Sequence, residues 1–189
     1  MTTPTAPLSF RRATESDVAV LVGLYDGAAR WMLDTGIDQW RPGDKDAAHF
    51  RARIADGEVW LALTAGGAVA GAYELWWRDE PAWGVRPPEA GYVHRLMTDR
   101  ALAPAGTGRA LLAHAERRIA DAGRALARLD FKASSPGLRA FYERAGYAVA
   151  GEQPFKAGGS GSAYAVVLME KRLGRERPGS AAGPVSQGR

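Results

Sequence analysis

Apolar residues recur along the chain with two different periods, and the changes between them predict alternating strands and helices. Short alternating or continuous apolar runs are typical of strands, whereas apolar residues at every third or fourth position are typical of a helix. The runs that predict strands are residues 8–11, 59–64, 69–77, 92–97, 126–131, 147–152 and 163–170. The stretches that predict helices are residues 17–36, 45–55, 110–122 and 136–145.

Clusters of glycine, proline and serine separate these elements and predict turns and loops. The A-G-G triplet at residues 65–67 indicates a hairpin, and the predicted loops are residues 36–44, 79–90 and 157–162. The order is one strand, two helices, a meander of strands, a β-α-β-α segment and two closing strands, with no internal repeat. This order predicts a single α/β domain in which helices pack on a mixed sheet.

The composition limits the classes of protein without choosing among them. A chain of 189 residues with 46% hydrophobic residues is long enough for one domain with a buried core. The absence of cysteine excludes disulfides, thiolate metal sites and a cysteine nucleophile, and we expect no bound metal. The N-terminus lacks the pattern of a signal peptide, and no segment has the ~20 apolar residues of a membrane span. We therefore expect a cytoplasmic protein without a membrane partner.

The surplus of positive charge lies at the C-terminus. The net charge is +4, and residues 171–189 carry Lys171, Arg172, Arg175, Arg177 and Arg189. The Gly, Pro and Ser content predicts a disordered basic tail at residues 173–189, and we expect disorder at residues 1–6 as well. Nucleic-acid binding would favour a basic face with interleaved aromatic residues, which the sequence lacks. We expect a solvated tail and no nucleic-acid partner, with a tail-mediated interaction protein as an alternative.

A glycine-containing turn lies between the strand that begins at Tyr92 and the helix that ends before Gly123. A helix N-terminus presents unpaired N–H groups, and Gly106 and Gly108 leave room for a phosphate to reach them. A P-loop would need lysine at Arg109, and the sequence also lacks the third glycine of a dinucleotide fingerprint. The turn therefore indicates a phosphate-bearing cofactor, or else an ordinary tight turn.

A second segment distinguishes these two readings. The strand-like run L-A-R-L-D-F (126–131) is followed by S-S-P-G-L-R-A-F-Y-E-R-A-G-Y (134–147). Together with the turn, this segment resembles the GCN5-related N-acetyltransferase (GNAT) superfamily. The family's turn reads Arg/Gln-x-x-Gly-x-Gly/Ala, and its later helix carries Tyr-x-x-x-Gly-Phe/Tyr. The matching residues are Ala103, Gly106, Gly108, Tyr142, Gly146 and Tyr147.

The resemblance extends less sharply over residues 8–170 and has two departures. Ala103 stands where the family has Arg or Gln, and Ser135 stands where many members have Asn. Backbone amides carry most of the phosphate binding, so the first departure does not abolish it. The resemblance implies a single-domain GNAT fold over residues 7–172, with a mixed, mostly antiparallel sheet that splays at the cofactor strand. Its implied cofactor is acetyl-CoA.

The resemblance also implies which residues hold the cofactor. The backbone of Leu96, Met97 and Thr98 would pair with the pantetheine arm, and Ser135 would contribute a polar contact. The pyrophosphate would lie on the turn, whose residues are Ala103, Ala105, Gly106, Thr107, Gly108, Arg109 and Ala110. Arg109 would add a charge, unless it is an ordinary surface arginine of the first helical turn.

Acetyl transfer to an amine requires a base, a donor for the developing oxyanion and an acid for the departing thiolate. Tyr142 stands where the family places the acid, although it also fits a core aromatic beside Phe141. Glu74 is the first candidate base, because a carboxylate in an apolar segment needs a partner or a purpose. His94 is the second candidate, since imidazole suits base chemistry. A chain of water molecules is a third route.

The acceptor site is expected to be aromatic. Residues from the regions that bound the acceptor in this family are Trp31, Trp40, Trp76, Trp77 and Trp83, and Asp38 would neutralise an amine. Each tryptophan also fits core packing. The sequence thus predicts an N-acetyltransferase that moves an acetyl group from acetyl-CoA to a primary amine of a small molecule or protein, by direct attack in a ternary complex. A non-catalytic acyl-CoA sensor is the alternative, and the protein would be a monomer or homodimer.

Overall fold

The computed structural model describes residues 7–37, 39–157 and 163–174. The predictions for residues 1–6, for Asp38 and for most of the basic tail lie outside these ranges. The strands are β1 (Ser9–Arg12), β2 (Glu58–Leu63), β3 (Val69–Trp76), β4 (Ala90–Thr98), β5 (Leu126–Lys132), β6 (Ala148–Ala157) and β7 (Ala163–Arg172). A single 3-10 turn, η1 (Glu15–Asp17), precedes the helices α1 (Val18–Asp34), α2 (Ala47–Asp56), α3 (Glu80–Trp83), α4 (Thr107–Asp121) and α5 (Pro136–Arg144).

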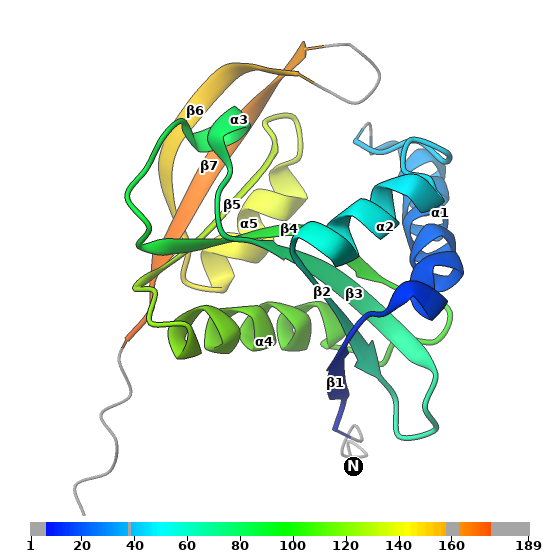
Figure 1. The fold of residues 1–189 in the computed structure, drawn as a ribbon. Coiled ribbons are helices and arrows are strands. Elements are labelled where there is room, and N and C mark those ends of the chain that lie inside the picture. The colour runs from blue at the N-terminus through cyan, green and yellow to red at the C-terminus, as the bar shows by residue number, and fades with distance from the viewer. Residues whose placement is uncertain (1–6, 38, 158–162, 175–189) are drawn as a thin grey trace, which may run out of the picture.

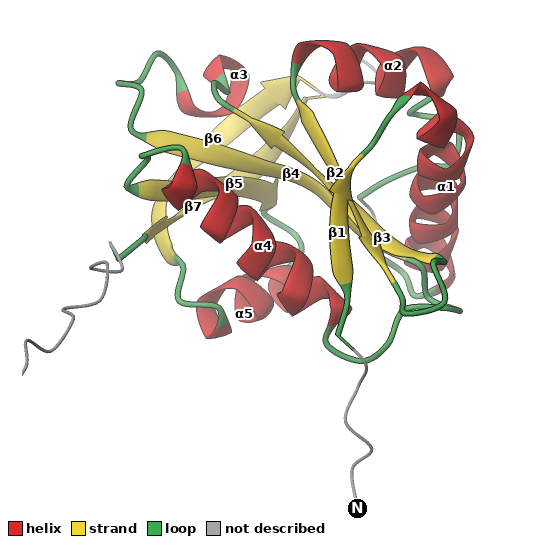
Figure 2. Cartoon of the chain, turned by 60° about the horizontal axis from the view of Figure 1, so that its bottom comes forward, coloured by secondary structure: helices red, strands yellow, loops and turns green. Residues whose placement is uncertain are grey.

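The strands form one seven-stranded sheet in the order β1-β2-β3-β4-β5-β7-β6. All neighbouring pairs are antiparallel except β4 and β5, which are parallel. The helices α1 and α2 lie on one side of the sheet, and α4 and α5 lie on the other (Figures 1 and 2). Leu111 and Ile119 of α4 belong to the core of one face, whereas Leu21 and Phe50 belong to the core of the other. The predicted mixed, mostly antiparallel α/β fold is confirmed.

Each predicted strand and helix is present, and the differences have local causes. The predicted loop 79–90 contains the short helix α3, which Asp79 caps by accepting a hydrogen bond from the Ala82 N–H at 3.3 Å. Strand β6 continues to Ala157, past Pro154, which by propensity would end a strand. It continues because β6 lies at the edge of the sheet and its pairing shifts register beside this proline.

The sheet opens between its two parallel strands. Strands β4 and β5 pair only near their starts, through Ala90 with Leu126, Gly91 with Ala127 and Tyr92 with Arg128. Beyond Tyr92, β4 continues to Thr98 and β5 to Lys132 without pairing to each other. The predicted splay at the cofactor strand is therefore present, and it exposes one backbone edge of β4.

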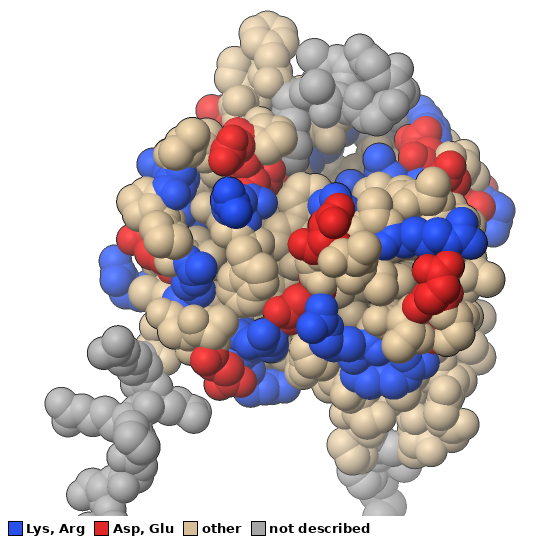
Figure 3. Space-filling model, viewed as in Figure 1, with Lys and Arg blue, Asp and Glu red and all other residues tan. Residues whose placement is uncertain are grey.

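Charged residues of both signs are interspersed over the face seen in Figure 3. Within the described residues, no helix combines the length and the apolar character that a membrane crossing needs.

An ion pair beneath α1 predicts acid-dependent stability. Arg11 donates from both terminal nitrogens to the carboxylate of Asp17 at 2.8 Å, and the Thr14 N–H donates to it as well. These bonds, with that from Arg11 the strongest, lower the pKa of Asp17 to about 2. A lowered carboxyl pKa stabilises the folded state above the ordinary value of about 4, and the contribution is lost as the pH falls towards 2.

We expect Asp17→Asn to cost about 1–2 kcal/mol of unfolding free energy at pH 7, since Arg11 is half exposed and water screens part of the pairing. The difference in unfolding free energy from wild type should narrow as the pH falls from about 4 towards 2 in denaturant titrations, because protonation then removes the same charge from the wild type. Asp34→Asn, at an exposed position, is the control and should stay within about 0.5 kcal/mol. A difference in unfolding free energy between Asp17→Asn and wild type that does not change with pH would contradict this account.

Candidate active site

A β-bulge interrupts β4 a few residues beyond the point where it separates from β5. Glu74 of β3 pairs with His94, but Ala72 pairs with Met97, so β4 carries one residue more than β3 over this interval. Arg95 in the bulge has φ 45°, a left-handed conformation that is costly for a residue with a side chain. Bulges of this kind re-aim side chains and free backbone groups beside functional sites.

The glycine turn joins this crevice to the N-terminus of α4. Gly106 precedes the helix with φ 86°, which only glycine adopts without strain. Thr107 is buried and its hydroxyl donates to the carbonyl of Pro104 at 2.7 Å, which fixes the turn. Within the described residues, no backbone hydrogen bond uses the N–H of Gly108 or Arg109. The turn therefore presents first-turn amides and the positive end of the helix dipole to a ligand.

The remaining predicted cofactor residues surround the same crevice. Met97 is buried in the core beneath α1, whereas Leu96 packs against the core on the α4 side. Ser135 is buried at the start of α5, and its hydroxyl donates to the side-chain oxygen of Gln39 at 3.4 Å. Arg109 is exposed on the first turn of α4. The structure thus brings the strand, the turn and the start of α5 to one place.

Tyr142 lies on α5 among aromatic rings. Its ring stacks on Phe131 of β5 at 5.7 Å and meets Phe141 and Tyr147 edge to face. Burial, and then the negative charge of Asp130, raise the pKa of the Tyr142 phenol well above its usual value. The phenol is therefore neutral and keeps a proton to donate.

Glu74 is fully buried and has three partners. It accepts hydrogen bonds from Arg95 at 2.6 Å and from the Trp76 indole at 3.0 Å, and His49 Nε2 lies 3.1 Å away. Burial alone would raise the pKa of Glu74, but the hydrogen bond with His49 and the charge of Arg95 outweigh it and lower the pKa. Sequence reasoning found the carboxylate but not Arg95, its main partner.

His94 lies beside two carboxylates. One ligand atom from each of Asp79, His94 and Asp130 lies within 4.8 Å of the others, and Nε2 of His94 is 3.1 Å from Oδ2 of Asp79. The imidazole stacks on Trp76 with ring centroids 4.0 Å apart and an interplanar angle of 28°. Asp130 sits in the buried strand run L-A-R-L-D-F, so the argument that selected Glu74 would also have selected it.

The predicted acceptor tryptophans have different surroundings among the described residues. Trp83 is buried in a core cluster beneath Arg128, and Trp40 stacks on Tyr25. Arg100 covers one face of Trp31 at 3.7 Å. Within the described residues, Trp76 is the one member of the predicted set whose ring stacks on, or donates a hydrogen bond to, a predicted catalytic side chain.

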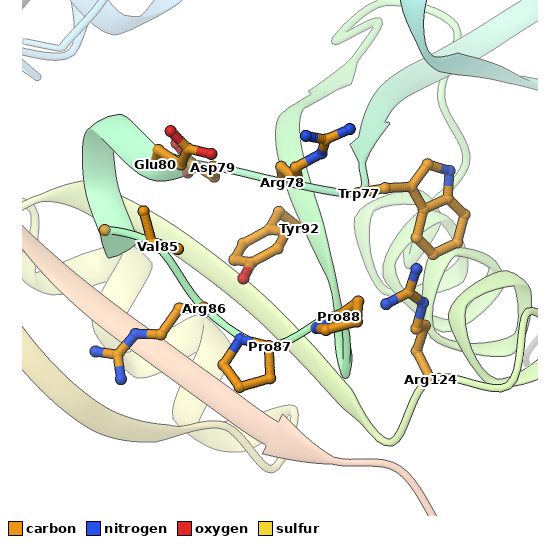
Figure 4. Close-up of a pocket in the computed structure, with 11 residues that line it drawn as sticks. Trp77, Arg78, Asp79, Glu80, Val85, Arg86, Pro87, Pro88, Tyr92 and Arg124 are labelled. Atoms are coloured by element: carbon orange, nitrogen blue, oxygen red, sulfur yellow. The ribbon is translucent and has the colours of Figure 1, made fainter.

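A cavity of about 480 Å³ lies at the start of β4 (Figure 4). Its lining includes Tyr92 and the arginines Arg78, Arg86 and Arg124. Strands β4 and β5 are still paired at Tyr92, so the cavity lies outside the splayed crevice. Asp79 belongs both to its wall and to the cluster around His94.

The comparison with known families decides the identity of this fold. Residues 29–169 match the sequence profile described as the acetyltransferase (GNAT) domain. The protein belongs to the GNAT family. Among curated protein sequences, none matches this GNAT chain.

Solved structures agree with the assignment. A GNAT acetyltransferase from Listeria monocytogenes is 27% identical, with a TM-score of 0.73 over 92% of this chain and 99% of that one. A phosphinothricin acetyltransferase from Sinorhizobium meliloti, solved with acetyl-CoA, is 19% identical, with a TM-score of 0.65 over 94% and 93%. The ribosomal-protein-alanine N-acetyltransferase of Brucella melitensis is 19% identical, with a TM-score of 0.64 over 88% and 100%. The last two likenesses establish the fold alone.

Proposed function

We propose that this GNAT protein transfers an acetyl group from acetyl-CoA to a primary amine of a small molecule or protein, by direct attack in a ternary complex. The observation that carries the proposal is the divergence of β4 from β5 beyond Tyr92, which leaves an unpaired strand edge leading to the amides of the Gly106–Gly108 turn. Similar folds solved with acetyl-CoA and named as N-acetyltransferases support the donor and the amine acceptor.

The residues of the crevice fit coenzyme A. The backbone of Leu96, Met97 and Thr98 would hold the pantetheine amides, and the first-turn amides of α4 would hold the pyrophosphate. A Cβ placed on Gly108 would meet only Phe141 and Leu96, at 3.6 Å and 3.8 Å, so the fold itself does not require glycine there. Its missing side chain is therefore best explained by a ligand that approaches the helix N-terminus.

Bound acetyl-CoA would supply a thioester carbonyl, and the protein would supply the groups around it. Backbone N–H groups freed by the bulge at Arg95 would donate to the carbonyl oxygen as negative charge develops. The neutral phenol of Tyr142 would protonate the departing sulfur. Glu74 would hold Arg95, and with it the bulge, in place.

The proposal is tested by following thiol release from acetyl-CoA in the presence of a panel of primary amines. The panel should include alkylamines, polyamines, amino acids and peptides with free N-termini. We expect thiol release that depends on an amine and yields its N-acetyl product by mass spectrometry. Coenzyme A binding without thiol release in the presence of any amine of the panel would favour the acyl-CoA sensor. The absence of coenzyme A binding would overturn both the acetyltransferase and the sensor.

Gly108→Val is expected to weaken coenzyme A binding at least 10-fold, because its extra methyl groups occupy the approach to the first-turn amides. Isothermal titration calorimetry measures the effect. Gly108→Ala is the matched control, since a single methyl meets only ordinary contacts and should leave the affinity within about 3-fold. Wild-type affinity in a folded Gly108→Val protein would remove the turn from the phosphate site.

A further inference from the structure

The cluster of Asp79, His94 and Asp130 lies at the point where the sheet opens. Tyr92 and Arg128 form the last pair between β4 and β5, and two further residues along each strand lead to His94 and Asp130. Because side chains alternate along a strand, His94 lies on the face of Tyr92 and Asp130 on the face of Arg128. An imidazole nitrogen of His94 and a carboxylate oxygen of Asp130 lie within 4.8 Å of each other, which places both side chains on one face of the crevice.

Local structure fixes two of these side chains. The Oδ1 atom of Asp79 caps α3 by accepting from the Ala82 N–H, which directs Oδ2 towards His94. The indole of Trp76 stacks on the imidazole and holds its plane. The side chains of Asp79 and His94 are only 1% and 10% exposed. The side chains of Asp79 and His94 are thus preorganised and largely buried.

The geometry around Nε2 of His94 points to a cationic ligand. Nε2 lies 3.1 Å from Oδ2 of Asp79, but within the described residues it makes no hydrogen bond. Two electronegative atoms held this close favour a positively charged donor beside them. An ammonium group has N–H bonds at tetrahedral angles, and hydrogen bonds of ~2.8 Å would place two of its acceptors about 4.6 Å apart. The ligand atoms of His94 and Asp130 lie within 4.8 Å of one another, so one ammonium group can reach both.

We propose that Asp130 and His94 bind the ammonium group of the acceptor amine, that His94 removes its proton, and that Asp79 is a positioning residue for His94. This inference rests on the proposed function and names the part of the crevice that takes the acceptor. It also gives Glu74 a structural role, because three donors already engage that carboxylate.

The reaction balances with these groups. An ammonium R–NH₃⁺ gives one proton to Nε2 of His94, and the freed lone pair forms the C–N bond to the acetyl carbon. The C–S bond breaks, and the sulfur takes the proton of the Tyr142 hydroxyl, which is replaced from the nitrogen. The products are the amide R–NH–COCH₃, the free thiol and a protonated imidazole beside Asp79, which returns its proton to water. The Asp79 carboxylate stabilises the imidazolium by its charge.

The first test compares ethylamine with 2,2,2-trifluoroethylamine, which has nearly the same shape but is mostly unprotonated at neutral pH. We expect His94→Gln to lower kcat for ethylamine about 100-fold, the usual contribution of a general base. The loss should shrink to less than about 5-fold for the weakly basic amine, which needs no base. Equal losses for both amines, or no loss for either, would overturn the role of His94.

The roles of the two carboxylates are distinguished by the kinetic parameter, KM or kcat, that each substitution changes. Asp130→Asn should raise KM for ethylamine about 10-fold with little change in kcat, since it removes a contact to the ammonium. Asp79→Asn should lower kcat for ethylamine about 10-fold and hardly affect the weakly basic amine, because asparagine caps α3 equally well. Asp121→Asn, exposed at the end of α4, is the control and should change neither parameter. A loss that is the same for both amines in Asp79→Asn would mean that Asp79 acts only on stability.

A binding experiment separates this inference from the proposed function. Titration of the coenzyme A complex with ethylamine should shift the imidazole ¹⁵N resonances of His94 in the wild type but not in Asp130→Asn. The resonance shift without thiol release would support the ammonium site and reject acetyl transfer. Thiol release without the resonance shift would support acetyl transfer and reject the ammonium site. The same titration with ZnCl₂ and MnCl₂ tests for a metal. Tight metal binding that Asp130→Asn abolishes, with activity lost in EDTA, would overturn the ammonium site.

Discussion

Replacing Tyr142 by phenylalanine is expected to lower kcat for acetyl transfer about 100-fold while leaving coenzyme A affinity within about 2-fold. Burial, and then the charge of Asp130, raise the pKa of this phenol well above its usual value, so it keeps a proton to donate. Phenylalanine keeps the ring and its packing on Phe131, so the pantetheine side of the crevice is preserved. Steady-state kinetics with acetyl-CoA and the best amine of the panel, together with calorimetry, measure both quantities.

Tyr147→Phe is the matched control for this experiment. Tyr147 lies in the same aromatic group, with its ring 5.9 Å from that of Tyr142, and it is buried as well. Loss of its hydroxyl should leave kcat within about 3-fold, because it does not belong to the proposed acid chemistry. An unchanged kcat in Tyr142→Phe, or equal losses in the two variants, would remove Tyr142 from the acid role.

Glu74→Ala is expected to cost about 3–5 kcal/mol of unfolding free energy, a large share of the stability of a domain of this size. The substitution leaves Arg95 largely buried without its carboxylate, and it removes an acceptor from Trp76 and a partner from His49. Urea denaturation measures the change. The strained bulge at Arg95 should relax as well, because the 2.6 Å ion pair holds its side chain.

Glu143→Ala is the control for charge removal. Glu143 forms an exposed pair with Arg139 within α5, and such pairs contribute less than about 0.5 kcal/mol. Glu74→Gln separates stability from catalysis, since it keeps the shape of the side chain without the charge. A Glu74→Gln protein with wild-type stability and a kcat lowered more than 100-fold would restore Glu74 as the general base.

The sequence predicted the elements and the glycine-containing turn before α4 because both depend on neighbouring residues. The apolar periods located each strand and helix, and Gly106 and Gly108 marked the turn at the start of α4. Tyr142 and the turn followed from the resemblance to GNAT proteins, and the splay between β4 and β5 is present as that resemblance implied. The element boundaries that differ from the prediction are set by pairing partners far along the chain. The extension of β6 past Pro154 is an example.

The proposed acceptor site was harder to predict from the sequence because it combines residues from distant segments. Asp79 follows β3, His94 lies on β4 and Asp130 on β5, and only the parallel register of the last two strands brings them together. No local pattern encodes that register. The bulge at Arg95 is equally hidden, since it depends on one unmatched residue between two paired strands. The surroundings of Trp83 and Trp31 are likewise set by arginines from distant segments, which the sequence alone does not place.

The stacking of Arg100 on Trp31 has a consequence for how this enzyme family member can evolve. Trp31 lies on α1, whereas Arg100 lies in the segment that runs from β4 into the glycine turn. Substitutions of Trp31 in α1 would therefore also alter the anchoring of the segment that leads to the proposed diphosphate site. Donor affinity should show epistasis at these two positions, and libraries that vary them together should retain donor binding more often than single-site libraries.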